Sequence, residues 1–239
     1  MHKLAYDLHI HSCLSPCGDK DMTPGNIVAM SKLKNLDVIA VTDHNSCKNC
    51  APVLKWADEY DIIAIPGMEL TTREEVHVLC LFSELADAMS FDAYVYEKLI
   101  KVPNNEKVFG TQEIYDSEDN IAGYEPYLLI NATSIAFDEL DGLMEEYSGI
   151  YIPAHIDKNS NSLLYNLGFI PPEAAFKAAE LADEKKITEL AALHPYLEKC
   201  RIVSNSDAHY LGYINEALNY LECVERSRQE IIKALSEAG

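Results

Sequence analysis

The sequence predicts an α/β fold, in which short buried strands alternate with helices and pair mostly in parallel. One observation is a strand–helix–strand rhythm of short apolar runs and amphipathic stretches that begins near the N-terminus. Another is that histidine or acidic residues follow several of these runs. The third is size: 239 residues with 48% hydrophobic side chains can bury the core of one large domain, and no linker or repeat divides residues 1–239.

The first expected strand covers residues 4–11, where apolar and polar side chains alternate with a period of two. Alternate residues of a strand point to the same face, so His9 and His11 would direct two imidazoles at one point. The loop 12–21 follows, which places the pair at the carboxyl end of a strand, where α/β proteins usually build their sites. Two neutral imidazoles at this spacing suit a first-row divalent metal ion.

The next elements follow from apolar periodicity and from end signals. Thr23 is a favourable N-cap, and Pro24 suits the first helical position. The apolar run at 62–65 is expected to end at Pro66-Gly67, because these residues interrupt regular structure. The expected elements are a helix at 24–34, a strand at 37–42, a helix at 47–60, strands at 62–65 and 76–82, and a helix at 85–101.

Residues 102–131 read as an insertion, because this stretch is more polar than its flanks. Two strand-like runs, 107–115 and 121–130, flank an acidic turn, which predicts a β-hairpin at the rim of the site or over it as a lid. Ser227 and Glu230 have the spacing of a capping box before a last helix. The remaining expected elements are helices at 135–147, 171–184 and 188–198 and strands at 149–154, 201–204 and 218–224.

The composition of the chain limits the binding partners and the cellular compartment that can be expected. Lys and Arg number 19 against 39 Asp and Glu, a net charge of −20, which disfavours nucleic acid as a partner because its phosphates attract a positive surface. The chain shows no signal peptide and no apolar run of membrane-spanning length, so no membrane partner is expected. Seven cysteines, an odd number, indicate a reduced, cytoplasmic protein. No prediction of oligomeric state follows.

Histidines and acids recur at the ends of the later expected strands or within them. In a barrel-like α/β fold these strand ends converge on one face. So many imidazoles and carboxylates would be electrostatically unfavourable there without bound metal. The residues concerned are His44, Glu69, His77, His155, Asp207 and His209.

Taken in order, these motifs resemble those of the polymerase and histidinol phosphatase (PHP) domain. They are His9-Ile10-His11, Thr42-Asp43-His44, Gly67-Met68-Glu69, the later His77 and His155, and Ser206-Asp207-Ala208-His209. The resemblance covers nearly the whole chain. It implies a distorted (β/α)7 TIM-like barrel, a centre of three divalent metal ions, and phosphoesterase activity.

The resemblance also implies a ligand set for each ion. The first would take His9, His11, Glu69 and Asp207; the second Glu69, His77 and His155; the third His44, His209 and one residue of the loop after His11. For that loop ligand Asp19 matches the family best, with Cys17 and Asp21 as alternatives. Imidazole and carboxylate ligands suit Zn, Mn or Fe. Asp7 and Asp43 are expected to orient the ligands.

Three divalent ions among three carboxylates would make the pocket locally positive by roughly three charges on an acidic protein. That contrast favours a small phosphate monoester, a phosphorylated metabolite or nucleotide, as substrate. A hydroxide bridging two ions would attack phosphorus. Asp207 and His209 are expected to act in catalysis as well as in binding, and Lys158 would reach the phosphate.

Two other functions remain open, a 3′–5′ exonuclease or phosphodiesterase on nucleic-acid ends and a catalytically inactive metal-binding module. The net charge disfavours the first, and the full ligand set disfavours the second. The pairs Cys13/Cys17 and Cys47/Cys50 allow an accessory zinc site, although free thiols fit their spacing better.

Overall fold

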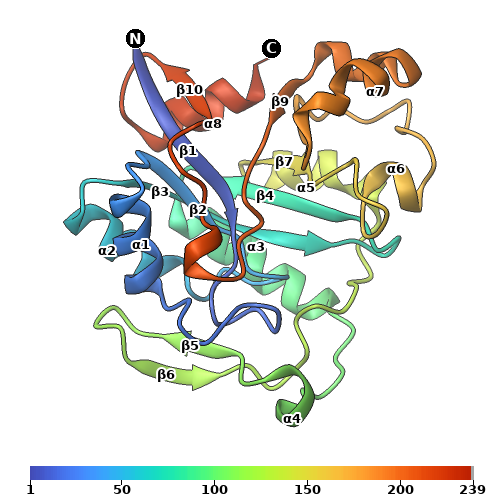
Figure 1. Ribbon diagram of the computed structural model, residues 1–239. Helices are drawn as coiled ribbons and strands as arrows, with labels where there is room; N and C mark the ends of the chain where they lie inside the picture. The colour runs from blue at the N-terminus through green and yellow to red at the C-terminus, as the bar shows by residue number, and fades with distance from the viewer. Residues whose placement is uncertain (238–239) are drawn as a thin grey trace.

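The computed structural model describes residues 1–237, and a curled six-stranded sheet forms its centre (Figure 1). The strand order is β10-β1-β2-β3-β4-β7, and a separate two-stranded sheet, β8–β9, packs beside β7. Among residues 1–237, no helix has the length and apolar character needed to cross a bilayer. The strands of the central sheet are β1 (His2–Ile10), β2 (Val38–Val41), β3 (Ile63–Thr71), β4 (His77–Phe82), β7 (Gly149–Pro153) and β10 (Tyr220–Cys223).

The α/β class is confirmed, but the sheet is mixed rather than mostly parallel. The pairs β1–β2 and β2–β3 are parallel, whereas β3–β4, β4–β7 and β1–β10 are antiparallel. Only residues 72–76 separate β3 from β4. A connection this short joins antiparallel neighbours, because a parallel crossover needs a dozen or more residues.

A register shift between Asp7 and Ile10 changes which side chains of β1 face the interior. Leu4, Tyr6 and Leu8 pack with inner residues of β2, β4 and β7. After the shift, Ile10 turns outward to the cluster under helices α1 and α2. The expected strand is therefore confirmed, and its uniform alternation is not. Such a bulge re-aims the residues that follow it, here His9 and His11.

Strand β3 does not end at Pro66-Gly67, and that prediction is wrong. Pro66 is accommodated opposite Val41 in the parallel register, and the strand continues to Thr71. Gly67 allows β4 to approach closely, because a Cβ there would lie 2.5 Å from the Cys80 carbonyl oxygen. Glu69 consequently projects from within a strand that is paired on both of its halves.

Two N-terminal helices cover the outer face of β1 and β2 (Figure 1). Thr23 caps α1 as expected, since its side chain accepts the Asn26 N–H with Pro24 at the first position. At the other end of the chain, Ser227 caps α8, but Glu230 bonds Val224 rather than completing the box. The longer helices are α1 (Pro24–Leu33), α2 (Cys50–Glu59), α3 (Leu85–Lys98), α5 (Leu140–Glu146) and α8 (Arg228–Ser236).

The insertion contains the expected hairpin in a shorter form, β5 (Glu113–Tyr115) and β6 (Ile121–Tyr124), after the short helix α4 (Glu106–Phe109). It is tied to the first loop and helix. Asp119 accepts bonds from the Thr23 hydroxyl and the Gly25 N–H, and the Glu113 N–H donates to the Cys13 carbonyl. The hairpin therefore supports the loop after β1.

The helix expected at 171–184 is absent from this part of the described chain, where strand β8 (Ala178–Glu180) forms instead. It pairs in parallel with β9 (Arg201–Val203), and its residues are buried. Burial and pairing override the helical preference of this alanine-rich segment. The remaining elements are α6 (Leu163–Asn166), α7 (Ile187–Leu193) and the 3₁₀ helices η1 (Phe137–Glu139), η2 (Glu184–Lys186), η3 (Pro195–Lys199) and η4 (Leu211–Tyr213).

Candidate metal centre

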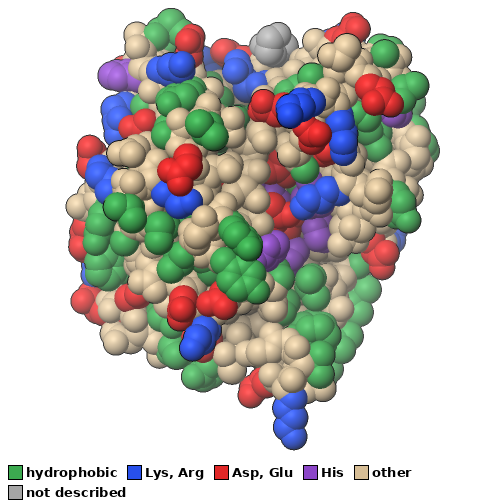
Figure 2. Space-filling model, viewed as in Figure 1, with side chains coloured by type: hydrophobic (Ala, Val, Ile, Leu, Met, Phe, Trp, Pro, Cys, Tyr) green, Lys and Arg blue, Asp and Glu red, His purple; other side chains and the backbone are tan. Residues whose placement is uncertain are grey.

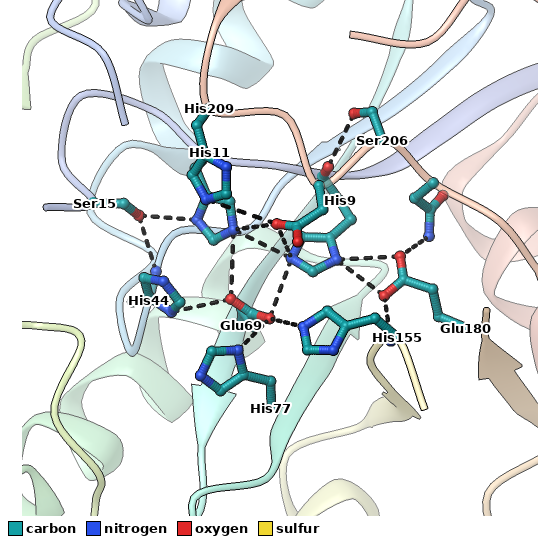
Figure 3. A network of polar contacts seen from close by, with 12 residues as sticks. His9, His11, Ser15, His44, Glu69, His77, His155, Glu180, Ser206 and His209 are labelled. Atoms are coloured by element: carbon teal, nitrogen blue, oxygen red, sulfur yellow. Dashed lines mark hydrogen bonds and ion pairs between the residues drawn. The ribbon is translucent and has the colours of Figure 1, made fainter. Parts of the chain in front are cut away.

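Two buried imidazoles from the end of β1 form the middle of the site (Figure 3). The Nε2 atoms of His9 and His11 lie 3.2 Å apart. His9 Nδ1 lies 3.1 Å from both carboxylate oxygens of Glu180. A carboxylate accepts hydrogen bonds, so this nitrogen carries a proton and Nε2 is the atom that His9 turns to the centre.

The same assignment holds for His11. Its Nδ1 lies 3.1 Å from Ser15 Oγ, and that hydroxyl donates to Asp43 Oδ1 at 2.6 Å. Ser15 therefore accepts from His11, which leaves the His11 Nε2 lone pair facing the centre. Two imidazole nitrogens this close need a proton or a metal cation between them, because their lone pairs would otherwise repel each other.

Glu69 is the residue that joins the imidazoles into one cage (Figure 3). It is 1% exposed, and both carboxylate oxygens face imidazole nitrogens. A carboxylate in this position can bridge two ions. The distances from a Glu69 oxygen are 2.9 Å to His77 Nδ1, 3.0 Å to His44 Nδ1, 3.2 Å to His9 Nε2, and 3.4 Å to both His11 Nε2 and His155 Nε2.

Asp207 and His209 close the cage from the loop after β9. Asp207 Oδ1 lies 3.2 Å from His11 Nε2 and 3.4 Å from His9 Nε2. His209 stacks on His11, with ring centroids 4.7 Å apart and planes at 4°. Asp207 has φ +51° and His155 has φ +31°, a region that costs a non-glycine residue energy and is enriched at functional sites.

The charges of these groups match those of metal ligands. Burial opposes ionisation of Glu69, but the imidazoles of His77, His9 and His44 outweigh it and hold its pKa well below the usual range. Burial lowers the pKa of His11 to about 3. Burial acts the same way on His9, but the carboxylates of Glu180, Glu69 and Asp207 raise its pKa well above the usual value. Ionised carboxylates and a neutral imidazole are ready to bind a cation, which would displace the proton of His9.

The residues present fit divalent ions. Within residues 1–237, Glu69 Oε1, His44 Nδ1 and His155 Nδ1 are buried and make no hydrogen bond of normal geometry, although imidazole nitrogens surround Glu69. Buried polar atoms of this kind require a partner. Three groups of side chains bring one ligand atom each within 4.8 Å of one another: His9, His11 and Glu69; His44, Glu69 and His77; and His11, Cys17 and His209.

The loop after β1 brings Cys17, not Asp19, to the other ligand atoms. Asp19 is half-buried, its Oδ1 accepts the Asp21 N–H, and Asp21 itself is exposed. No group of potential ligands among residues 1–237 includes either carboxylate. The Asp19 backbone N–H donates instead to the His209 carbonyl at 2.9 Å, which holds the loop against His209. Cys13, Cys47 and Cys50 also belong to no such group within those residues, so no support arises for a four-cysteine zinc site.

Glu180 is the functional residue that sequence reasoning missed. It is 2% exposed, binds His9 Nδ1, and accepts the His155 N–H and an Asn205 amide N–H. Burial opposes its ionisation, but His9 and His155 with the Asn205 bond lower its pKa. Glu180 lies in the segment expected to be a helix, and no histidine or motif flanks it, so the sequence held no signal for it.

Asp7 and Asp43 do not bond the imidazoles directly, but bond residues of the loops around them. Asp43 accepts the Ser12 N–H and the hydroxyls of Ser12 and Ser15, and it reaches His11 through Ser15. Asp7 accepts the Ser206 N–H and the Asn215 N–H, which fixes the loop that carries Asp207. Both carboxylates therefore orient loops rather than imidazoles directly.

The cage opens to a cavity of about 190 Å³. Figure 2 shows histidine side chains at the floor of a hollow in this face, next to basic and acidic groups. The Lys158 ammonium lines the cavity and pairs with Asp207 Oδ2. Burial disfavours its charge, but Asp207 outweighs this and raises the pKa of Lys158. Ser160, Asn161 and Ile130 also line the cavity.

The protein thus belongs to a class defined by fold and site: an α/β sheet whose strand ends gather imidazoles around a shared carboxylate, in groups that could hold metal ions. The sequence model of the PHP domain matches residues 7–237. The chain therefore belongs to the PHP domain family, and the resemblance read from its motifs is confirmed.

One known protein is similar in sequence to part of this chain. An uncharacterized protein of Methanocaldococcus jannaschii is 31% identical over 93 residues, 35% of this chain and 54% of that protein. The chain thus spans about half the length of the curated relative it matches.

Solved structures share the fold. A lesion-specific endonuclease from Pyrococcus furiosus superposes with a TM-score of 0.68 at 20% identity, over 98% of this chain and 56% of that one. A Bifidobacterium adolescentis protein classed as a metal-dependent phosphoesterase has a TM-score of 0.54 at 16% identity, over 95% of each chain. At these identities the similarity concerns the fold alone.

Proposed function

We propose that this protein hydrolyses a small phosphate monoester, a phosphorylated metabolite or nucleotide, at a centre of three divalent ions (Zn, Mn or Fe). One observation carries the proposal: lone pairs of His9 and His11 converge with Glu69 and Asp207 at the floor of a cavity that Lys158 also lines. A cavity of about 190 Å³ has room for a phosphate and a small leaving group.

The proposed ligand sets keep the order of the motifs. One ion takes His9, His11, Glu69 and Asp207; a second takes Glu69, His77 and His155; the third takes His44, His209 and a residue of the loop after β1, for which Asp19, Cys17 and Asp21 are the candidates. Glu69 supports the first two sets, because its oxygens lie within 3.4 Å of imidazoles from both. The third set differs from the observed grouping, in which His44 lies with Glu69 and His77.

Bound ions would supply an activated water and hold the phosphoryl oxygens as negative charge builds. The chain supplies the rest. His9 and His11 are fixed in the required tautomers by Glu180 and Ser15. Lys158, whose charged form Asp207 favours, would bind a phosphoryl oxygen through that positive charge. Asp207 and His209 would contact the substrate side of the centre from the same loop.

The barrel described for the family is also proposed here. Seven strands form a ring if β8 and β9 are taken to continue the sheet from β7 back to β1. Ile156 donates to the Glu180 carbonyl on one side of β8, and the bridge between Ile10 and Ala208 links the end of β9 to β1. This distorted (β/α)7 arrangement would bring His155 and Asp207 to the same opening as His9.

A reducing, cytoplasmic setting is proposed as well. All seven cysteines are free, and six of them are buried. Buried free thiols are the common state in reducing compartments.

A second candidate is hydrolysis of a phosphodiester in nucleic acid. It is favoured by the similarity to the Pyrococcus furiosus endonuclease and to an Endonuclease Q solved in complex with a duplex substrate that carries an abasic lesion. The net charge of −20 argues against it, because a negative surface repels a polyanion outside the cavity. That endonuclease is also longer than the present chain, which covers 56% of it.

The test compares a chromogenic phosphomonoester, a phosphodiester and a lesion-containing oligonucleotide, each with and without chelator. We expect chelator-sensitive release of phosphate from the monoester, and a loss of at least about 100-fold in His9→Ala. Faster turnover of the diester or the oligonucleotide would favour the second candidate. Activity on none of the three at full metal loading would leave a metal-binding module. Turnover of His9→Ala close to wild type would end both enzymatic proposals.

A further inference from the structure

The loop after β1 is built so that one thiol reaches the cage. The Ser12 and Ser15 carbonyls accept the N–H groups of Ser15 and Gly18, which folds the loop back on itself. Gly18 is required for this turn, because a Cβ there would lie 2.1 Å from the Ser12 carbonyl oxygen. The turn places Cys17 on the inner side of the loop, where it lines the cavity with His44 and His209.

The Cys17 sulfur lies within 4.8 Å of the ligand atoms of both His11 and His209, and those two atoms are equally close to each other. The rings of His11 and His209 are stacked and nearly parallel (Figure 3). The bond from the Asp19 N–H to the His209 carbonyl fixes the loop to the segment that carries His209. The segments that carry Cys17 and His209 are therefore bonded directly to each other.

The His11 Nε2 atom is also within reach of Asp207 and Glu69. The lone pair of His11 can bind only one ion at a time. If it binds the first ion, with Glu69 and Asp207, then Cys17 and His209 remain as the ligands of the third, outer ion. A thiolate among imidazoles selects zinc, ferrous or cobaltous ions over manganese or magnesium, which prefer oxygen.

We propose that Cys17 is a thiolate ligand of the outer metal ion, paired with His209, and that it makes this position selective for a thiophilic ion. The inference rests on the proposed metal centre but not on its reaction. It excludes the carboxylate of Asp19 as the loop ligand. It also predicts that this ion alone is released when the thiol is alkylated or oxidised.

The test uses the purified protein of 239 residues, stripped with chelator and reloaded with Co²⁺. We expect the near-ultraviolet charge-transfer band typical of a thiolate–cobalt bond, with bound cobalt counted by elemental analysis. Cys17→Ser should lose the band and one equivalent of cobalt. Cys13→Ser is the matched control from the same loop, and it should keep both. Asp19→Asn should also keep both.

A second variant keeps the test valid if Cys17→Ser folds poorly. Cys17→Asp should retain the cobalt equivalent without the band, and it should shift the competition between Zn²⁺ and Mn²⁺ towards Mn²⁺ at that position. A band that persists in Cys17→Ser, or an equivalent lost in Asp19→Asn and kept in Cys17→Ser, would overturn the inference. The readouts separate it from the proposed function: a band without phosphatase activity rejects only the function, and activity without a band rejects only the thiolate.

Discussion

His9 illustrates how a single side chain at this centre is set by its neighbours. The bulge in β1 turns it inward, Glu180 accepts its Nδ1 proton, and its Nε2 faces Glu69 and Asp207. A carboxylate on the far nitrogen of a metal-binding histidine fixes the tautomer and makes the ligand more basic. Glu180 should therefore control metal affinity without contacting the ion.

We expect Glu180→Gln to weaken metal binding and turnover by about 10- to 100-fold, because the amide removes the charge that supports His9. Metal titration of the stripped protein and steady-state kinetics would measure both effects. Glu184→Gln, at an exposed position of the neighbouring η2, is the control and should change neither. Equal metal affinity in Glu180→Gln and the control would show that the contact only packs the core.

At the scale of elements, the site depends on strands that approach unusually closely. Glu69 projects inward because β3 continues past Pro66-Gly67 and pairs with β2 on one half and β4 on the other. Gly67 permits the pairing with β4, because a side chain there would collide with the Cys80 carbonyl and the Leu81 side chain. The loops matter equally, since Asp157 ties the segment after β7 to the segment after β8 by accepting the N–H groups of Ala182 and Asp183.

Gly67→Ala should destabilise the fold by about 1–3 kcal/mol, because the added methyl group has no room between two paired strands. Urea denaturation followed by circular dichroism would measure the change. Gly123→Ala in β6 is the matched control, since a Cβ there meets nothing within 4 Å. A midpoint for Gly67→Ala that matches the control would mean that β4 can move away from β3 at little cost.

Asp157 should make stability depend on pH. Burial opposes its ionisation, but the Ala182 N–H and Lys186 outweigh this and lower its pKa. A carboxyl with a lowered folded-state pKa stabilises the fold above its unfolded value, about 3.9, and that contribution disappears as the pH falls through the folded-state pKa.

Asp157→Asn should therefore be less stable than wild type near neutral pH, with a difference that shrinks in acid. Thermal melting between neutral pH and pH 3 would follow it. Asp58→Asn at the exposed end of α2 should leave the profile unchanged. A constant difference across the whole pH range would exclude an electrostatic origin.

At the scale of the whole molecule, a negative protein encloses a site that concentrates carboxylates and lone pairs. The net charge is −20, and Glu69, Glu180 and Asp207 all have lowered pKa values despite the opposing effect of burial. Divalent ions would neutralise this interior charge in the folded state only. Metal loading should then be a main determinant of stability.

Removal of metal should lower the melting temperature. One ion present at 100 times its dissociation constant contributes about 2.7 kcal/mol. Differential scanning calorimetry of stripped and reloaded protein would measure the loss and its reversal by Zn²⁺, Mn²⁺ or Fe²⁺. His209→Ala should reduce the metal-dependent gain, whereas His194→Ala, outside the site, should not. Identical melting with and without metal would contradict a metal centre inside the core.

Local patterns in the sequence were enough to predict the α/β class, the family, and most of the histidines and acids that meet in the cage. These features are local. Apolar runs, residues at strand ends and short motifs can be interpreted without knowing which distant residues they contact. Thr23 and Pro24 opened α1 as expected for the same reason.

Four features could not be predicted in this way: the bulge in β1, the antiparallel half of the sheet, the strand β8 and the contact of Glu180 with His9. Each depends on a residue distant in sequence. Glu180 becomes a partner of His9 because β8 pairs with β9, and Cys17 reaches His209 because a backbone bond joins two loops. Contacts between distant segments leave no periodic pattern in the local sequence. They become visible only in the three-dimensional structure.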